Sequence, residues 1–298
     1  MEQFILISIF VAIGALFKRL PVFPEDTDQV LNMFALYIAL PAVILIKVPQ
    51  LSFSTDMIVP AVLPWFMLVF SAALVLWMGK LFKWSREVTG VLLLVVPIGN
   101  TSFMGVPMVM AFFGEQGIPP LIIYDQIGTM LIFAVYGSVI LAMYGSDAKI
   151  KISRVVSRAL LFPPTLALFA GLALRSWPYP APVFDSLQML SKMLTPLVMT
   201  AIGFQLKIRL SPAILHPLGY GLAIKLAVAP IFALGICRLM GFYGLSVDVS
   251  VFEAGMPPMV TAGALAMAAG LMPELAAATI SLGMIISFMT LPILYNII

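Results

Sequence analysis

The chain alternates long apolar stretches with short clusters of charged residues, and this alternation limits its fold more than any other feature. Of its 298 residues, 62% are hydrophobic and only 10% are charged, whereas an average soluble protein carries roughly 25% charged residues. A helix needs about 20 apolar residues to cross the hydrocarbon core of a bilayer. We therefore expect an all-α integral membrane protein with ten transmembrane helices. The predicted spans are 3–17, 29–48, 57–79, 88–113, 119–144, 159–176, 183–206, 214–238, 246–270 and 275–297.

The positions of lysine and arginine predict how these spans are oriented. Basic residues are concentrated in the odd-numbered loops, and cytoplasmic loops are the ones that collect lysine and arginine. The odd loops are therefore expected in the cytoplasm and both termini outside, in a bacterial inner membrane. This also accounts for the net charge of +3 without a nucleic-acid partner. The odd loops hold Lys18, Arg19, Lys80, Lys83, Arg86, Lys149, Lys151, Arg154, Arg158, Lys207 and Arg209, and the even loops hold Lys47, Arg175 and Arg238.

One span contains residues that break helices. Pro97, Gly99, Gly105 and Pro107 surround the polar triplet at 100–102. Proline removes a backbone donor and clashes with the preceding turn, so we expect this helix to be interrupted. Interrupted backbone at membrane depth must line a cavity or be buried in protein, and many transporters build substrate sites in this way. The alternative is a proline-kinked helix whose small polar residues contact a neighbouring helix.

A second copy of this stretch lies at 252–270. Gly255 and Gly270 each follow their counterparts, Gly99 and Gly114, at the same spacing of 156 residues. The match predicts two repeats of five spans, 1–146 and 147–298, joined by the basic loop 145–157. An odd number of spans inverts the second repeat, so the broken middles of spans 4 and 9 are expected to cross near the midplane. Their second half-helices would then direct their N-termini at that crossing and favour an anion there.

These same stretches resemble the auxin efflux carrier family, which includes plant carriers and bacterial permeases for malonate and similar organic acids. The resemblance is strongest in GNTSFMGVPMVMAFFG and AGMPPMVTAGALAMAAGLMPELAAATISLGMIISFMTLPILY. It implies crossover helices at spans 4 and 9, an architecture shared with the bile-acid sodium symporters. It also implies a scaffold of spans 1, 2, 6 and 7 and a transport unit of spans 3–5 and 8–10. Asn100 matches the asparagine that contacts substrate carboxylate, and Pro257 or Pro258 matches the crossover proline of span 9.

Four ionisable residues fall in or near the membrane. Lys225 lies mid-span, too far from either end to reach water easily. A lysine there costs a few kcal/mol or more, so it should face a cavity, the substrate, Asp125 or Glu253. Glu253 lies one turn before the break in span 9, where a carboxylate could relay a proton or help to bind sodium. The alternative for Glu253 and Asp125 is an acid near a helix start. Lys192 lies nearer a span end and can snorkel.

Together these features predict a secondary active transporter of small organic anions, mono- or dicarboxylates that are malonate-like or auxin-like. Coupling to a proton, to sodium or to the membrane potential stays open. The alternatives are a passive channel or sensor with the same fold, or a sodium-coupled symporter of the bile-acid type. An enzyme is not expected, because HExxH, DDxxD and GxGD motifs are absent and the chain has one histidine.

The predicted site has no catalytic residue and no cofactor. Its only candidate metal is sodium, held by Glu253, Thr101 and Ser102. The expected partners are the organic anion and membrane lipid, with a homodimer through the scaffold as an open alternative. Predicted substrate-binding residues are Asn100, Thr101, Ser102, Pro257, Pro258, Thr261 and Lys225; coupling residues are Glu253 and Asp125; helix-break residues are Pro97, Gly99, Gly105, Pro107 and Gly255.

Overall fold

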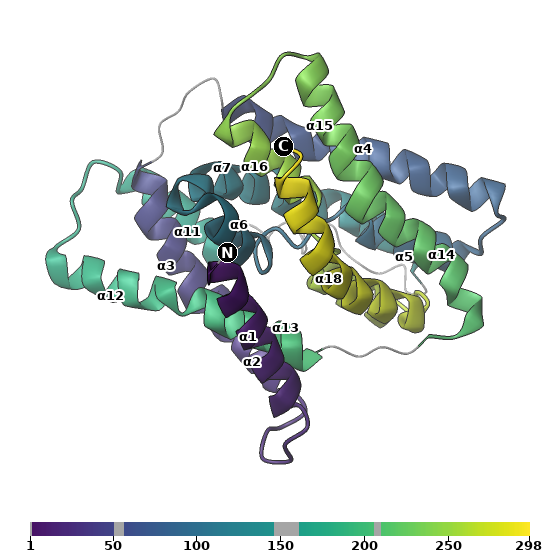
Figure 1. Ribbon diagram of the computed structural model, residues 1–298, viewed down its shortest axis with the longest axis horizontal. Coiled ribbons are helices and arrows are strands. Elements are labelled where there is room, and N and C mark those ends of the chain that lie inside the picture. Colours follow the sequence, from purple (N-terminus) through teal and green to yellow (C-terminus); the bar gives the residue numbers. More distant parts are fainter. Residues whose placement is uncertain (1, 51–56, 146–160, 206–209) are drawn as a thin grey trace. The chain divides into compact units, whose positions relative to one another are not determined.

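The computed structural model describes residues 2–50, 57–145, 161–205 and 210–298, with side chains from residue 5 onward, and its regular secondary structure in these ranges is helical (Figure 1). Within them there is no β-strand, and a single isolated bridge pairs Gly99 with Pro258. The predicted all-α class is confirmed for this part of the chain. Most of the predicted loop 145–157 lies outside the described residues, as do Lys149, Lys151, Arg154, Arg158, Lys207 and Arg209.

The helices follow the apolar stretches of the sequence. In chain order they are α1 (Glu2–Phe17), α2 (Thr27–Phe34), η1 (Ala35–Ala39), α3 (Leu40–Lys47), η2 (Val48–Gln50), α4 (Ile58–Leu81), α5 (Arg86–Val95), α6 (Gly105–Phe113), η4 (Glu115–Gly117), α7 (Ile118–Ile123), η5 (Tyr124–Thr129), α8 (Met130–Ile132), η6 (Phe133–Gly137), α9 (Ser138–Tyr144), α11 (Pro163–Ala173), α12 (Ala181–Lys192), α13 (Leu194–Gln205), α14 (Pro212–Ala223), η7 (Ile224–Val228), α15 (Ala229–Leu239), α16 (Leu245–Ala254), α17 (Val260–Ala268) and α18 (Pro273–Tyr295).

Six helical stretches among the described residues are long and apolar enough to cross a membrane without interruption. The four other predicted spans do not meet this criterion, for two reasons. The helices at Ile5–Phe17 and Pro163–Ala173 are apolar but short. The spans predicted at 88–113 and 246–270 are each divided into two half-helices. The prediction of ten spans therefore stays a prediction. The six long stretches are Thr27–Gln50, Ile58–Leu81, Glu115–Tyr144, Ala181–Gln205, Pro212–Leu239 and Pro273–Tyr295.

Three of the long stretches contain π-helical turns: η1 lies in Thr27–Gln50, η5 and η6 lie in Glu115–Tyr144, and η7 lies in Pro212–Leu239. Two of these turns end shortly before a proline, Pro41 after η1 and Pro230 after η7. A proline has no N–H, so the carbonyl four residues earlier loses its α-helical hydrogen bond. The extra residue of a π turn absorbs this local disruption. Such turns are frequent at functional sites, and η5 and η7 carry two of the predicted ionisable residues, Asp125 and Lys225.

Contacts divide the chain into two compact units. Unit 1 comprises Met1–Ser54, Ser102–Ile122 and Arg158–Leu206, and unit 2 comprises Thr55–Thr101, Ile123–Ser157 and Lys207–Ile298. The four spans of the predicted scaffold fall in unit 1, which also takes residues 102–122 from spans 4 and 5. The boundary between the units therefore lies inside the polar triplet at 100–102. The two predicted sequence repeats, 1–146 and 147–298, stay a prediction.

Unit 1 is held together by close helix packing. Helices α1 and α13 lie side by side (Figure 1), and α3 packs against α11 and α12. A Cβ atom added to Gly14 would lie 1.9 Å from the carbonyl oxygen of Thr200, and one added to Gly203 would lie 2.0 Å from the carbonyl oxygen of Val11. Only glycine permits this backbone approach, which is a common way to join helices in membranes.

Unit 2 is organised around the first halves of the two interrupted spans. Nearly every residue of 88–95 and 249–254 is buried. Helix α5 packs against α4, α9, α17 and α18, and α16 packs against α4, α15 and α18. A helix that is apolar on all sides is expected to be covered on all sides. The core of unit 2 thus surrounds the points at which α5 and α16 end.

Candidate functional site

The two interrupted segments of unit 2 meet through their backbones. The N–H of Asn100 donates to the carbonyl of Pro257 at 2.7 Å, and the N–H of Met259 donates to the carbonyl of Ile98 at 3.0 Å. These bonds form the antiparallel bridge between Gly99 and Pro258. Buried backbone groups outside a helix need partners. Each interrupted segment therefore supplies the hydrogen bonds that the other has lost.

Lys225 lies directly against this bridge. It is 4% exposed, and its Nζ atom donates to the carbonyl of Ala254, the last residue of α16, at 3.2 Å. A Cβ atom added to Gly99 would lie 3.2 Å from the same Nζ atom. Glycine at position 99 thus leaves room for the ammonium group. A carbonyl at a helix C-terminus also carries the negative end of the helix dipole, which stabilises a nearby cation.

Asp125 has two donors from different parts of the sequence. The hydroxyl of Thr101 donates to its Oδ1 atom at 2.5 Å, and Nε2 of Gln126 donates to its Oδ2 atom at 2.7 Å. The aspartate is 2% exposed. The sequence left open the alternative of an acid near a helix start. The structure instead places it in the interior of unit 2, on the π-helical turn η5.

Two buried polar side chains have no hydrogen-bond partner among the described residues. They are Glu253, which is 0% exposed, and Asn100, which is 1% exposed. Neither carboxylate oxygen of Glu253 and neither amide atom of Asn100 is bonded. Leaving a buried polar group unsatisfied costs about 1–3 kcal/mol, and more for a charged group. Such groups are retained where a ligand, an ion or a bound proton supplies the interaction that the protein itself does not provide.

A cavity of about 10 Å³ lies beside Glu253 and Lys225. Its walls include Pro97, Gly99, Thr101, Tyr124, Lys225 and Glu253. A space of this size holds roughly one water-sized particle, whereas sites for small organic molecules are typically 300–1,000 Å³. The cavity therefore suits a water molecule or a monatomic cation. It does not suit an organic anion in this conformation.

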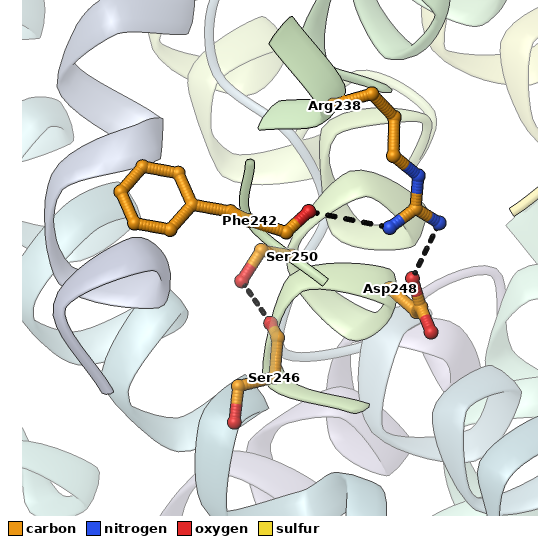
Figure 2. A network of polar contacts seen from close by, with 5 residues as sticks. All are labelled: Arg238, Phe242, Ser246, Asp248 and Ser250. Carbon is orange, nitrogen blue, oxygen red and sulfur yellow. Dashed lines mark hydrogen bonds and ion pairs between the residues drawn. The ribbon is translucent and has the colours of Figure 1, made fainter. Parts of the chain in front are cut away.

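A surface network positions the start of α16, which carries Glu253. Figure 2 shows the guanidinium of Arg238, at the end of α15, between two acceptors. Its Nη2 atom lies 3.1 Å from Oδ1 of Asp248, and its Nη1 atom donates to the carbonyl of Phe242 at 3.3 Å. In the same view the hydroxyl of Ser250 donates to the carbonyl of Ser246 at 2.6 Å. The pair of Arg238 and Asp248 ties the first turn of α16 to the preceding helix.

The structure brings some of the predicted site residues together and separates others. Thr101, Lys225 and Glu253 share the cavity, and Asp125 joins them through Thr101. Ser102 belongs to unit 1 and is not part of the cavity wall. Thr261 is half-buried on α17, also away from that wall.

The helix-break residues take distinct places. The first break covers 96–104, so Pro97 and Gly99 lie inside it. Gly105 begins α6, with Pro107 in its first turn, where proline is tolerated because the first N–H groups have no intrahelical partner. Gly255 caps α16. The second half-helices begin at Gly105 and Val260.

Sequence reasoning missed several contacts. Gln126 was not singled out, although it neighbours Asp125, and the pair of Arg238 and Asp248 was not foreseen. His216, the single histidine of the chain, lies within α14 and was not assigned a partner from the sequence. Its Nδ1 atom accepts a hydrogen bond from the indole of Trp84 at 3.4 Å. The only feature of the sequence that could have indicated this contact is the presence of aromatic residues near both 82–84 and 216–220.

Comparison with known proteins identifies the kind of protein that carries this site. A sequence model of the membrane transport protein family matches residues 1–295. The chain belongs to this family. The match confirms the resemblance to the auxin efflux carriers, and with the six long apolar helices it identifies an integral membrane protein.

Two relatives match this chain over most of their own length. An uncharacterized transporter of Methanothermobacter thermautotrophicus is 28% identical over 296 residues, which cover 98% of this chain and 96% of the relative. An uncharacterized transporter of Methanocaldococcus jannaschii is 25% identical over 266 residues, which cover 86% of this chain and 85% of the relative. Both names describe transporters.

Proposed function

We propose that the protein is a secondary active carrier of small organic anions, which binds the anion carboxylate beside Asn100 and moves it by alternating access. The observation that carries the proposal is the side-chain amide of Asn100, which is buried, unpartnered among the described residues and located where α5 has ended. Membership in the membrane transport protein family supports the general class. An amide N–H is a suitable donor to a carboxylate.

The proposal includes two inverted repeats of five spans, with broken helices that cross. Two observations support it. The interrupted segments pair in antiparallel orientation, which is the orientation that a two-fold relation between inverted repeats produces. Gly114 and Gly270, which occupy equivalent positions in the predicted repeats, both have positive φ angles, of 70° and 73°. Each follows the second half-helix of its span. In this arrangement the free N–H groups at the start of α17 favour the anion.

Coupling is proposed at Glu253 and Lys225. The cavity that they line holds one small particle, so either a proton carried with water or a sodium ion fits it. Sodium binding would use oxygen atoms of Glu253 and Thr101. Ser102, the third oxygen ligand predicted from the sequence, is not part of this cavity wall. Its absence favours coupling to a proton over coupling to sodium. We also propose that the protein lies in the inner membrane, with the odd-numbered loops in the cytoplasm and both termini outside.

Uptake into proteoliposomes tests this function. We expect the wild type to accumulate a radiolabelled mono- or dicarboxylate above its external concentration when a pH or sodium gradient is imposed, and to stop when that gradient is collapsed. Downhill equilibration alone would indicate a channel. Imposing the two gradients separately identifies the coupling ion.

The variant Asn100→Ala tests the binding site. A hydrogen bond to a charged group contributes about 1.5–3 kcal/mol, so we expect affinity for the transported anion to fall about tenfold or more. Thermal stability should not fall, because the side-chain amide of Asn100 has no hydrogen-bond partner among the described residues. Asn296→Ala is the matched control, since that asparagine is exposed near the C-terminus. Wild-type affinity in a well-folded Asn100→Ala protein would refute the site.

A further inference from the structure

Unit 1 contains a cavity of its own, and the transport site described above does not use it. Its volume is about 460 Å³, which lies within the usual range for sites that bind small organic molecules. Every residue of its wall belongs to unit 1. The wall is mostly apolar, with contributions from α1, α3, α6 and α12, and its charged members are Lys47, Glu115 and Lys192.

Lys47 and Glu115 form an ion pair on this wall. The Nζ atom of Lys47 lies 2.6 Å from Oε2 of Glu115. The lysine side chain is 14% exposed, whereas the glutamate side chain is 76% exposed. Glu115 follows Gly114, whose φ angle is 70°, and lies in the short turn η4. An exposed pair of this kind contributes little to stability. The glutamate can therefore leave its partner at small cost.

Lys192 supplies the remaining charge. It is the last residue of α12, and Met193 separates it from α13. Within the described part of the chain it has no ion-pair partner. The cavity wall therefore carries two ammonium groups and one carboxylate, which gives it a net charge of +1. A single negative charge on a ligand would neutralise this charge.

We propose that this cavity binds a small monocarboxylate with an apolar body. The carboxylate pairs with Lys192, and the body packs against the apolar wall formed by residues such as Ile7, Phe10, Val106 and Met110. A dicarboxylate is disfavoured, because it would leave an excess negative charge among apolar side chains. This site goes beyond the proposed function and does not depend on Asn100.

Calorimetric titration of the purified protein tests this site, with benzoate and hexanoate as probes. Benzamide is the neutral control and succinate is the dianion. We expect saturable binding of both monocarboxylates, none of benzamide and weaker binding of succinate. Lys192→Gln should lower benzoate affinity about tenfold or more, since it removes the charged partner of the carboxylate. Lys192→Arg keeps the charge and should stay within about threefold of the wild type.

Glu115→Gln provides a readout that a purely structural role would not change. It raises the net charge of the cavity from +1 to +2 and frees Lys47. Succinate affinity should then rise about tenfold, while benzoate affinity changes much less. An unchanged ratio of succinate to benzoate affinity would overturn the proposed role of the pair.

Other outcomes separate this site from the one at Asn100. Benzoate binding that Asn100→Ala abolishes and Lys192→Gln leaves intact would place the anion at the helix break and overturn the proposal. Absence of saturable benzoate and hexanoate binding to the wild type would also overturn it. So would equal binding of benzamide, which would indicate an apolar site of the kind that accepts lipid. Binding that depends on Lys192 in a protein that transports no organic anion would refute the proposed function alone.

Discussion

The two units hold similar pairs of charged residues in opposite environments. In unit 1, Lys47 and Glu115 form an exposed ion pair on the wall of a cavity of about 460 Å³. In unit 2, Lys225 and Glu253 line a cavity of about 10 Å³, and both are buried. An exposed ion pair contributes about 0–1 kcal/mol, whereas leaving a charge buried without a partner typically costs about 3–5 kcal/mol. The comparison indicates that the exposed Glu115 can exchange its partner at small cost. Lys225 and Glu253 are shielded from water, so a change in their partners requires a ligand to enter or a helix to move.

The largest expected effect comes from Lys225→Met. The change removes the ammonium group from the small cavity and leaves Glu253 buried without a neighbouring cation. We expect the free energy of unfolding to fall by about 3–5 kcal/mol, measured by denaturant titration in mixed micelles. The double variant Lys225→Met, Glu253→Gln should recover most of the loss. Lys192→Met in unit 1 is the control and should be nearly neutral; equal losses in the two lysine variants would remove the contrast between the units.

Gly203→Ala should follow, at about 3 kcal/mol. Its new Cβ atom would lie 2.0 Å from a backbone oxygen of α1, so the helices α1 and α13 must separate. Gly235→Ala is a matched control in a helix, because nothing lies within 4 Å of its added Cβ atom. That variant should be neutral or slightly stabilising. Similar melting temperatures for the two variants would mean that the close approach of α1 and α13 contributes nothing to stability.

Asp248→Asn should have a smaller effect, about 1 kcal/mol. The pair of Arg238 and Asp248 is half-buried, with side chains that are 29% and 26% exposed. It therefore falls between the exposed pair of unit 1 and the buried pair of unit 2. Stability in detergent measures the loss, and Asp185→Asn on the exposed face of α12 is the control. A loss of stability as large as that of Lys225→Met would show that this ion pair behaves energetically like a fully buried charge.

The smallest stability change is expected for Glu115→Gln, about 0.5 kcal/mol or less. Its carboxylate is largely exposed, so water and salt screen the contact with Lys47. High salt should remove what difference remains. A loss of several kcal/mol, insensitive to salt, would show that this ion pair is structural and would contradict its proposed exchange with a ligand.

Local sequence predicted most of the helices and both interruptions. The last span was predicted at 275–297 and the helix covers Pro273–Tyr295, because a long apolar run has few alternatives to a helix. Prolines and glycines act on the backbone where they stand, so the breaks at 96–104 and 255–259 were also readable. Asn100, Thr101, Lys225 and Glu253 were named for their polarity at membrane depth.

The partners of these residues were not predictable. Thr101 donates to Asp125 and Lys225 donates to the carbonyl of Ala254 only because helices distant in sequence pack together. Periodicity within one helix carries no information about such contacts. The same limit applies to the division between Thr101 and Ser102 and to the cavity of unit 1, whose wall combines helices that are distant in sequence.

The backbone pairing of the two interrupted segments also constrains the order in which the protein can be completed. Ile98 and Asn100 hydrogen-bond to Met259 and Pro257, which the ribosome adds only near the end of synthesis. At roughly 5–20 residues per second, the end of α5 waits on the order of ten seconds for these partners. Until then its free backbone groups must stay in contact with water or the insertion machinery, because lipid cannot satisfy them. The segment that follows α5 therefore gains these backbone partners only after the segment that follows α16 has been synthesised.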